Sequence, residues 1–138
     1  MSNIKDASLW QSGKDKIDWV RSYMPLLTMI EEDFKKNQPF AGMKISMSIH
    51  LEAKTANLAK VLRAGGAEVR VTGCNPLSTQ DDVAAALVHE GFEVNAVFTK
   101  KNDLPDYQSM PSHECPMCKN QRRLDAMVNA FGVSSFGI

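Results

Sequence analysis

Two stretches of this chain share an organisation that strongly limits what it can fold into. Residues 46–55 and 72–81 each begin as the end of a short apolar strand and run directly into the start of a helix. Strands that alternate with helices are typical of a parallel sheet with right-handed crossovers. Both junctions are crowded with polar side chains of mixed type, although a scaffold needs only a capping residue there. Because open parallel sheets bind ligands at the carboxyl ends of their strands, these junctions predict a ligand site.

The apolar spacing predicts the elements around these junctions. Apolar residues at steps of three and four indicate helices over 14–23 and 25–36, divided at Pro25 because proline disrupts the interior of a helix. Further elements are expected as strands at 44–49, 68–72 and 92–98 and as helices at 52–64 and 79–90. Ser78 stands three residues before Asp81, as in a capping box. The first thirteen residues are expected to form a loose arm, with Trp10 packing as its only anchor.

These elements predict an α/β fold with three layers, in which a short parallel sheet is flanked by helices and the early helix pair covers part of the sheet. The architecture is Rossmann-like without a dinucleotide-binding motif, because no G-x-G-x-x-G string occurs in the chain. After Thr99 the sequence becomes polar and contains Pro105 and Pro111. We therefore predict an α/β domain at 1–99, followed by a linker and a CxxC-containing tail at 100–138.

Composition argues against several classes of function. The 138 residues are 43% hydrophobic, which supports one domain with its own core. Sixteen basic and sixteen acidic residues give a net charge of zero, so nothing attracts the chain to nucleic acid or to an anionic membrane. No apolar stretch approaches the ~20 residues of a membrane span. Three cysteines, an odd number, fit a reducing compartment, and we expect a soluble cytoplasmic protein.

The strings SIHLEAKTA (48–56) and GCNPLSTQDDVAAAL (73–87) resemble the N-terminal, substrate-binding part of S-adenosylhomocysteine hydrolase (adenosylhomocysteinase). The resemblance covers about residues 15–98. It implies that His50 faces the ribose, that Lys54 and Thr55 approach the adenine, and that Glu52 lies towards the amino-acid half of the substrate. The residues that it places beside the reacting nucleoside are Cys74 and Asn75. The implied ligand is adenosine or S-adenosylhomocysteine.

Some of the polar residues at the two junctions also have a plain structural explanation. A lone histidine such as His50 is often a solvated or hydrogen-bonded residue with no ligand. Ser78 and Asp81 fit a role in capping the following helix. Cys74 fits a small buried residue better than a nucleophile, since no base stands beside it in sequence.

The tail carries a separate candidate site in Cys115 and Cys118. A CxxC pair is half of a structural zinc site, which needs four ligands in all. His113 is close in sequence, and a second subunit is another source of ligands. The alternative is two reduced thiols without metal.

The resemblance also implies a reaction that this sequence does not support. The hydrolase oxidises its substrate with bound NAD, and a hydride acceptor needs a binding turn that is missing here. We therefore expect no catalytic residue, no NAD and, of cofactors, only zinc. Three functions stay open: a truncated hydrolase-like protein that binds a nucleoside, a structural or assembly protein with a zinc-binding tail, and a nucleoside-processing enzyme of another class. Because a three-stranded sheet exposes two edges, we expect a homo-oligomer.

Overall fold

The computed structural model of this chain describes residues 2–100 and Asp103. A single turn of 3-10 helix, η1 (Ala7–Leu9), leads into four α-helices and three strands. In chain order these are α1 (Trp10–Ser22), α2 (Pro25–Asn37), β1 (Lys44–Ile49), α3 (Ala53–Ala64), β2 (Glu68–Gly73), α4 (Asp81–His89) and β3 (Glu93–Asn95). The structure therefore confirms the alternation of strands and helices that the sequence predicts.

The three strands form one sheet in the order β1-β2-β3, and both neighbouring pairs are parallel. Ile49, the last residue of β1, is paired with Gly73, the last residue of β2. The two strands thus end level with each other, which brings the loops that follow them to the same edge. Side chains alternate along β1 and β2, and the hydrophobic core includes Met47, Val69 and Val71 from alternate positions of these strands.

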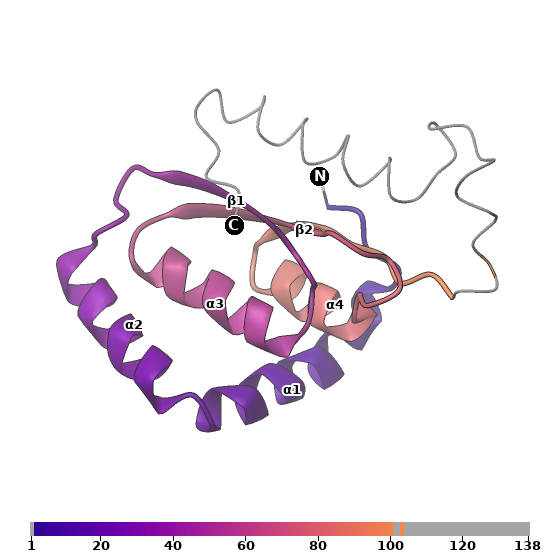
Figure 1. Cartoon of the computed structure of the whole chain (residues 1–138), viewed down its shortest axis with the longest axis horizontal. Helices are drawn as coiled ribbons and strands as arrows, with labels where there is room; N and C mark the ends of the chain where they lie inside the picture. Colours follow the sequence, from indigo (N-terminus) through magenta and orange to yellow (C-terminus); the bar gives the residue numbers. More distant parts are fainter. Residues whose placement is uncertain (1, 101–102, 104–138) are drawn as a thin grey trace.

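The helices flank the sheet in two tiers, as Figure 1 shows. α3 and α4 pack beside β2 and β3, and α1 lies across α3 and α4 while α2 packs on α3. The prediction that the early helix pair covers part of the sheet is therefore wrong, because α1 and α2 bury their apolar stripes against other helices. Ile17 and Val20 of α1 join the same core as the apolar residues of α4.

Two further expectations need correction near the ends of the described region. The first thirteen residues are not a loose arm: Asn3 forms a parallel bridge with Asn95, and α1 already begins at Trp10. Trp10 does pack as an anchor, since its ring stacks on His89 with centroids 3.9 Å apart. The third strand is shorter than predicted, because Phe98 donates its backbone N–H to the Asp81 carboxylate.

The start of α4 also differs from the prediction. The helix begins at Asp81 with Gln80 as its N-cap, and no side chain caps it. Ser78 is not a cap, because its hydroxyl contacts His50 and the Asn75 carbonyl oxygen. Contacts with other parts of the fold thus replace the capping interactions expected of Ser78 and Asp81.

Candidate functional site

The carboxyl edge of the sheet carries the first group of predicted site residues. His50 follows β1 and Cys74 follows β2, and the Cys74 backbone N–H donates to the Ile49 carbonyl oxygen at 3.3 Å. The loops that hold these two residues therefore lie side by side. Leu51, directly after His50, is fully buried and fixes the path of the backbone. His50 itself is exposed, so its ring is accessible from solvent.

His50 is held from two directions. Its ring Nδ1 lies 2.5 Å from the Ser78 hydroxyl oxygen. Its backbone carbonyl accepts a hydrogen bond from the Thr55 hydroxyl at 2.6 Å. Thr55 is buried, and the partner of its hydroxyl is the backbone of His50. The sequence pattern assigns Ser78 to a helix cap, because a serine three residues before Asp81 fits that role, whereas the structure places its hydroxyl against His50.

Asn75 shapes the loop after β2. Its side-chain Oδ1 accepts a hydrogen bond from the Leu77 backbone N–H at 2.9 Å, as in an Asx-turn. Its backbone carbonyl accepts from the hydroxyls of Ser78 and Thr79, at 3.2 and 3.1 Å. Cys74 is a half-buried free thiol next to it. The loop is thus held in shape by its own polar groups, and Asn75 is its centre.

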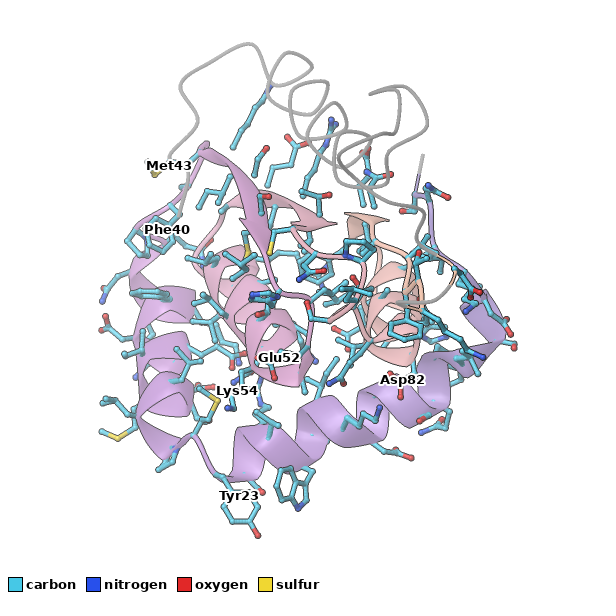
Figure 2. The ribbon with its side chains drawn as sticks, turned by 45° about the vertical axis from the view of Figure 1, so that its right-hand side comes forward. Tyr23, Phe40, Met43, Glu52, Lys54 and Asp82 are labelled. Atoms are coloured by element: carbon cyan, nitrogen blue, oxygen red, sulfur yellow. The ribbon has the colours of Figure 1, made fainter. Side chains whose placement is uncertain are left out.

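Glu52 and Lys54 belong to a second group at the start of α3. The Glu52 side chain caps this helix by accepting from the Thr55 backbone N–H at 3.2 Å. Figure 2 shows Glu52 and Lys54 at the end of α3 that lies nearest α1. There they line an open cleft of about 700 Å³, together with Gln80. α1 supplies the facing wall with Ser12, Asp15, Lys16, Trp19 and Val20.

The predicted site residues therefore divide into two neighbouring sets. His50, Thr55, Cys74 and Asn75 gather at the sheet edge, and Glu52 and Lys54 turn to the cleft. Only three residues, 51–53, separate His50 from Lys54 in the chain. The cleft has the volume of a small-molecule pocket and combines an indole, two carboxylates and two ammonium groups.

The wall formed by α1 is fixed to α4 by a polar clamp. Asp82 accepts a hydrogen bond from Ser12 at 2.9 Å and forms an ion pair with Lys16 at 2.6 Å. The pKa of Asp82 is lowered from 3.8: partial burial raises it, but the hydrogen bonds from Lys16 and Ser12 and the charge of Lys16 outweigh that effect. The clamp therefore favours the ionised carboxylate and joins the α1 wall of the cleft to α4.

The predicted metal ligands Cys115 and Cys118 lie outside the described residues. Within the part of the chain that the structure describes, no group of three or more histidine, cysteine or acidic side chains is placed to hold a metal ion. Over the same residues, no helix is long and apolar enough to cross a bilayer.

The fold and the strand-end loops define the class of protein: a parallel α/β domain that gathers polar groups at the carboxyl edge of its sheet and in the adjoining cleft. Comparison with known proteins then gives the family. The family model for S-adenosyl-L-homocysteine hydrolase matches residues 1–133, and the chain belongs to this family. The match extends beyond residues 15–98, on which the resemblance in sequence rested.

Several curated relatives are close in sequence. The S-inosyl-L-homocysteine hydrolase of Methanococcus maripaludis is 58% identical over 96 residues, which are 70% of this chain and 23% of that protein. The protein of the same name from Methanocaldococcus jannaschii is 54% identical over 96 residues, with the same coverage of both chains. An adenosylhomocysteinase from Thermococcus kodakarensis is 52% identical over 94 residues, 68% of this chain and 22% of its own. The chain thus spans about a quarter of the length of these relatives.

Proposed function

We propose that this chain binds the nucleoside part of an S-nucleosyl-L-homocysteine, and that it favours the inosyl over the adenosyl form. The observation that carries the proposal is Lys54, whose side chain lines the cleft at the start of α3. The family resemblance gives this position to the purine. Relatives named for S-inosyl-L-homocysteine and for S-adenosyl-L-homocysteine both match the chain, so the choice between the two purines depends on the chemistry of the residues.

The lysine ammonium discriminates between the two purines by its hydrogen-bonding capacity. An ammonium group donates three hydrogen bonds and accepts none. Hypoxanthine carries a carbonyl oxygen at its six-position, which accepts, whereas adenine carries an amino group, which donates. An ammonium of Lys54 placed at the six-position would donate a charge-assisted hydrogen bond to the oxygen of a 6-oxopurine, whereas in adenine it would face the amino group, which is itself a donor.

The remaining parts of the ligand have suitable partners nearby. His50, at the carboxyl edge, offers its ring to a ribose hydroxyl. Glu52 lines the cleft and offers a carboxylate to the ammonium of an amino acid. Trp19 is 64% exposed on the facing wall and offers a flat apolar surface. These roles extend the resemblance to a ligand with a purine, a ribose and an amino-acid tail.

The family's redox cofactor does not fit the residues of this chain. NAD needs a glycine-rich turn that lets its pyrophosphate approach the start of a helix. No such string occurs in the sequence, and the described turn after β1 is His50-Leu51-Glu52. The proposed activity of the chain is therefore binding without NAD-dependent oxidation.

The test compares inosine with adenosine by isothermal titration on the purified chain. A hydrogen bond to a charged group contributes about 1.5–3 kcal/mol, so inosine is expected to bind roughly tenfold to a hundredfold more tightly. Lys54→Gln supplies both a donor and an acceptor, and the preference should fall to near unity. Lys36→Gln, at an exposed position of α2, is the matched control and should keep the preference. Equal affinities in the unmodified chain, or a preference for adenosine, would contradict the role of Lys54.

A further inference from the structure

Ser78 links His50 to the loop after β2. Its hydroxyl oxygen lies 2.5 Å from His50 Nδ1 and 3.2 Å from the Asn75 carbonyl oxygen. The Ser78 backbone N–H donates to the same carbonyl at 3.2 Å, so the serine is fixed at two points. The ring of His50 therefore meets a side chain that is already held in place by the loop.

The protons in this chain of contacts can be assigned by counting donors. A serine hydroxyl has one hydrogen to donate, and a carbonyl oxygen only accepts. If Ser78 donates to Asn75, its oxygen is left to accept, and His50 must donate from Nδ1–H. If Ser78 donates to His50, its oxygen faces the Asn75 carbonyl oxygen with no hydrogen between them. Only the first arrangement places a hydrogen in both contacts of the Ser78 hydroxyl; the Asn75 carbonyl also accepts from the Ser78 backbone N–H and from the Thr79 hydroxyl, at 3.2 and 3.1 Å.

We propose that Ser78 is a positioning residue that holds neutral His50 as the Nδ1–H tautomer, so that Nε2 presents a lone pair at the carboxyl edge of the sheet. The Thr55 hydroxyl supports this arrangement by donating to the His50 backbone carbonyl at 2.6 Å. A lone pair at Nε2 accepts a hydrogen bond from a hydroxyl group. The identity of that hydroxyl as a ribose hydroxyl rests on the function proposed above, whereas the tautomer does not.

The tautomer can be measured without any ligand. Two-bond ¹H–¹⁵N correlation spectra of the ¹⁵N-labelled chain, recorded at pH ~8.5 where an ordinary imidazole is neutral, distinguish a protonated Nδ1 from a protonated Nε2. His50→Gln assigns the signals of His50. Those of His89, which is stacked on Trp10, give an internal reference.

Three variants separate the role of the hydroxyl from a general structural effect. Ser78→Ala removes the hydroxyl and should abolish the preference for Nδ1–H. Ser78→Thr keeps it and should restore the preference. Ser22→Ala, whose hydroxyl also donates to a backbone carbonyl at 2.6 Å, is the matched control and should leave His50 unchanged. Thermal melting of all three establishes that they are folded.

The observed tautomer of His50 either supports the proposal or overturns it. A predominant Nδ1–H tautomer that is lost in Ser78→Ala and kept in Ser78→Thr supports the proposal. A predominant Nε2–H tautomer in the unmodified chain overturns it, and so does an Nδ1–H tautomer that persists in Ser78→Ala. As a second readout, inosine affinity should fall about two- to tenfold in Ser78→Ala and recover in Ser78→Thr. If no nucleoside binds at all, the proposed function fails while the spectra still decide the tautomer.

Discussion

At the scale of single residues, α1 and α4 pack closely against each other at Gly13. A β-carbon at this position would lie 1.9 Å from the Asp82 carbonyl oxygen and 2.4 Å from its carbon. Both atoms belong to the backbone, so no side-chain rotation relieves the overlap. Gly13 is therefore a requirement of packing between two helices and not of backbone conformation.

This contact predicts a reversal of the usual effect of alanine in a helix. An exposed Gly→Ala substitution stabilises a helix by about 1 kcal/mol. In Gly13→Ala the steric overlap should dominate, and the free energy of unfolding is expected to fall by roughly 1–3 kcal/mol. Urea denaturation measures the change, with Gln11→Ala on the exposed side of α1 as the control. A gain in stability would mean that α1 and α4 are not packed in this way.

At the scale of elements, the clamp between α1 and α4 depends on pH through Asp82. Its pKa is lowered from 3.8 in the folded state, so the ionised carboxylate contributes stability at all pH values above 3.8. As pH falls below 3.8 and through the lower folded pKa, this contribution disappears. The ion pair is partly exposed, and its contribution near neutral pH is about 0.5–1 kcal/mol.

Asp82→Asn should therefore be less stable than the unmodified chain at pH 7 by that amount, and the difference should vanish as pH falls well below 3.8. Urea unfolding at a series of pH values measures it. Asp33→Asn, at an exposed position of α2, is the control. A difference that stays constant down to the lowest pH would assign the effect to something other than the charge of Asp82.

The helices and strands also show which parts of the fold can be predicted from the sequence. Residues 44–49 were predicted as a strand and form β1, because alternating side chains and the flanking loops mark both ends. The capping box and the end of the third strand were predicted wrongly. In both cases a residue distant in sequence takes the polar group: His50 contacts Ser78, and Phe98 donates to Asp81. Local patterns contain no information on such partners.

The candidate site, too, could be predicted from the sequence only in part. Adjacent parallel strands with level ends bring the loops that hold His50 and Cys74 side by side, as predicted from the sequence. The turn of Lys54 towards α1 depends on where α1 crosses α3, which no local pattern specifies. Ser78 was found only from its 2.5 Å contact with the histidine ring.

At the scale of the whole molecule, we predict self-association. Asn3 pairs beside β3, with its N–H donating to Val94 and its carbonyl accepting from Ala96, at 2.9 and 3.0 Å. This short segment covers part of one edge of the sheet. At the other edge, no described strand lies beside β1, and open edges favour pairing with another chain. Light scattering at micromolar concentration is expected to give at least a dimer, and a monomer mass would refute the prediction.

The last two predictions concern ligand binding and reaction by the whole chain. Inosine at 100 times its dissociation constant should raise the free energy of unfolding by about 2.7 kcal/mol, whereas NAD should leave the thermal midpoint unchanged. The reason is that the residues proposed to face the ligand are present, while the glycine-rich turn for a dinucleotide is absent from the sequence.

Without a hydride acceptor, the purified chain should release no homocysteine from S-inosyl-L-homocysteine or S-adenosyl-L-homocysteine. The full-length hydrolase of Methanococcus maripaludis, assayed alongside with NAD, is the positive control, since it is 58% identical to this chain over 96 residues. Homocysteine release in proportion to the amount of this chain, and reduced by Lys54→Gln, would show that its own residues support the complete reaction. Stabilisation by inosine without release would instead separate binding from chemistry, because the same cleft would hold the nucleoside with no group to oxidise it.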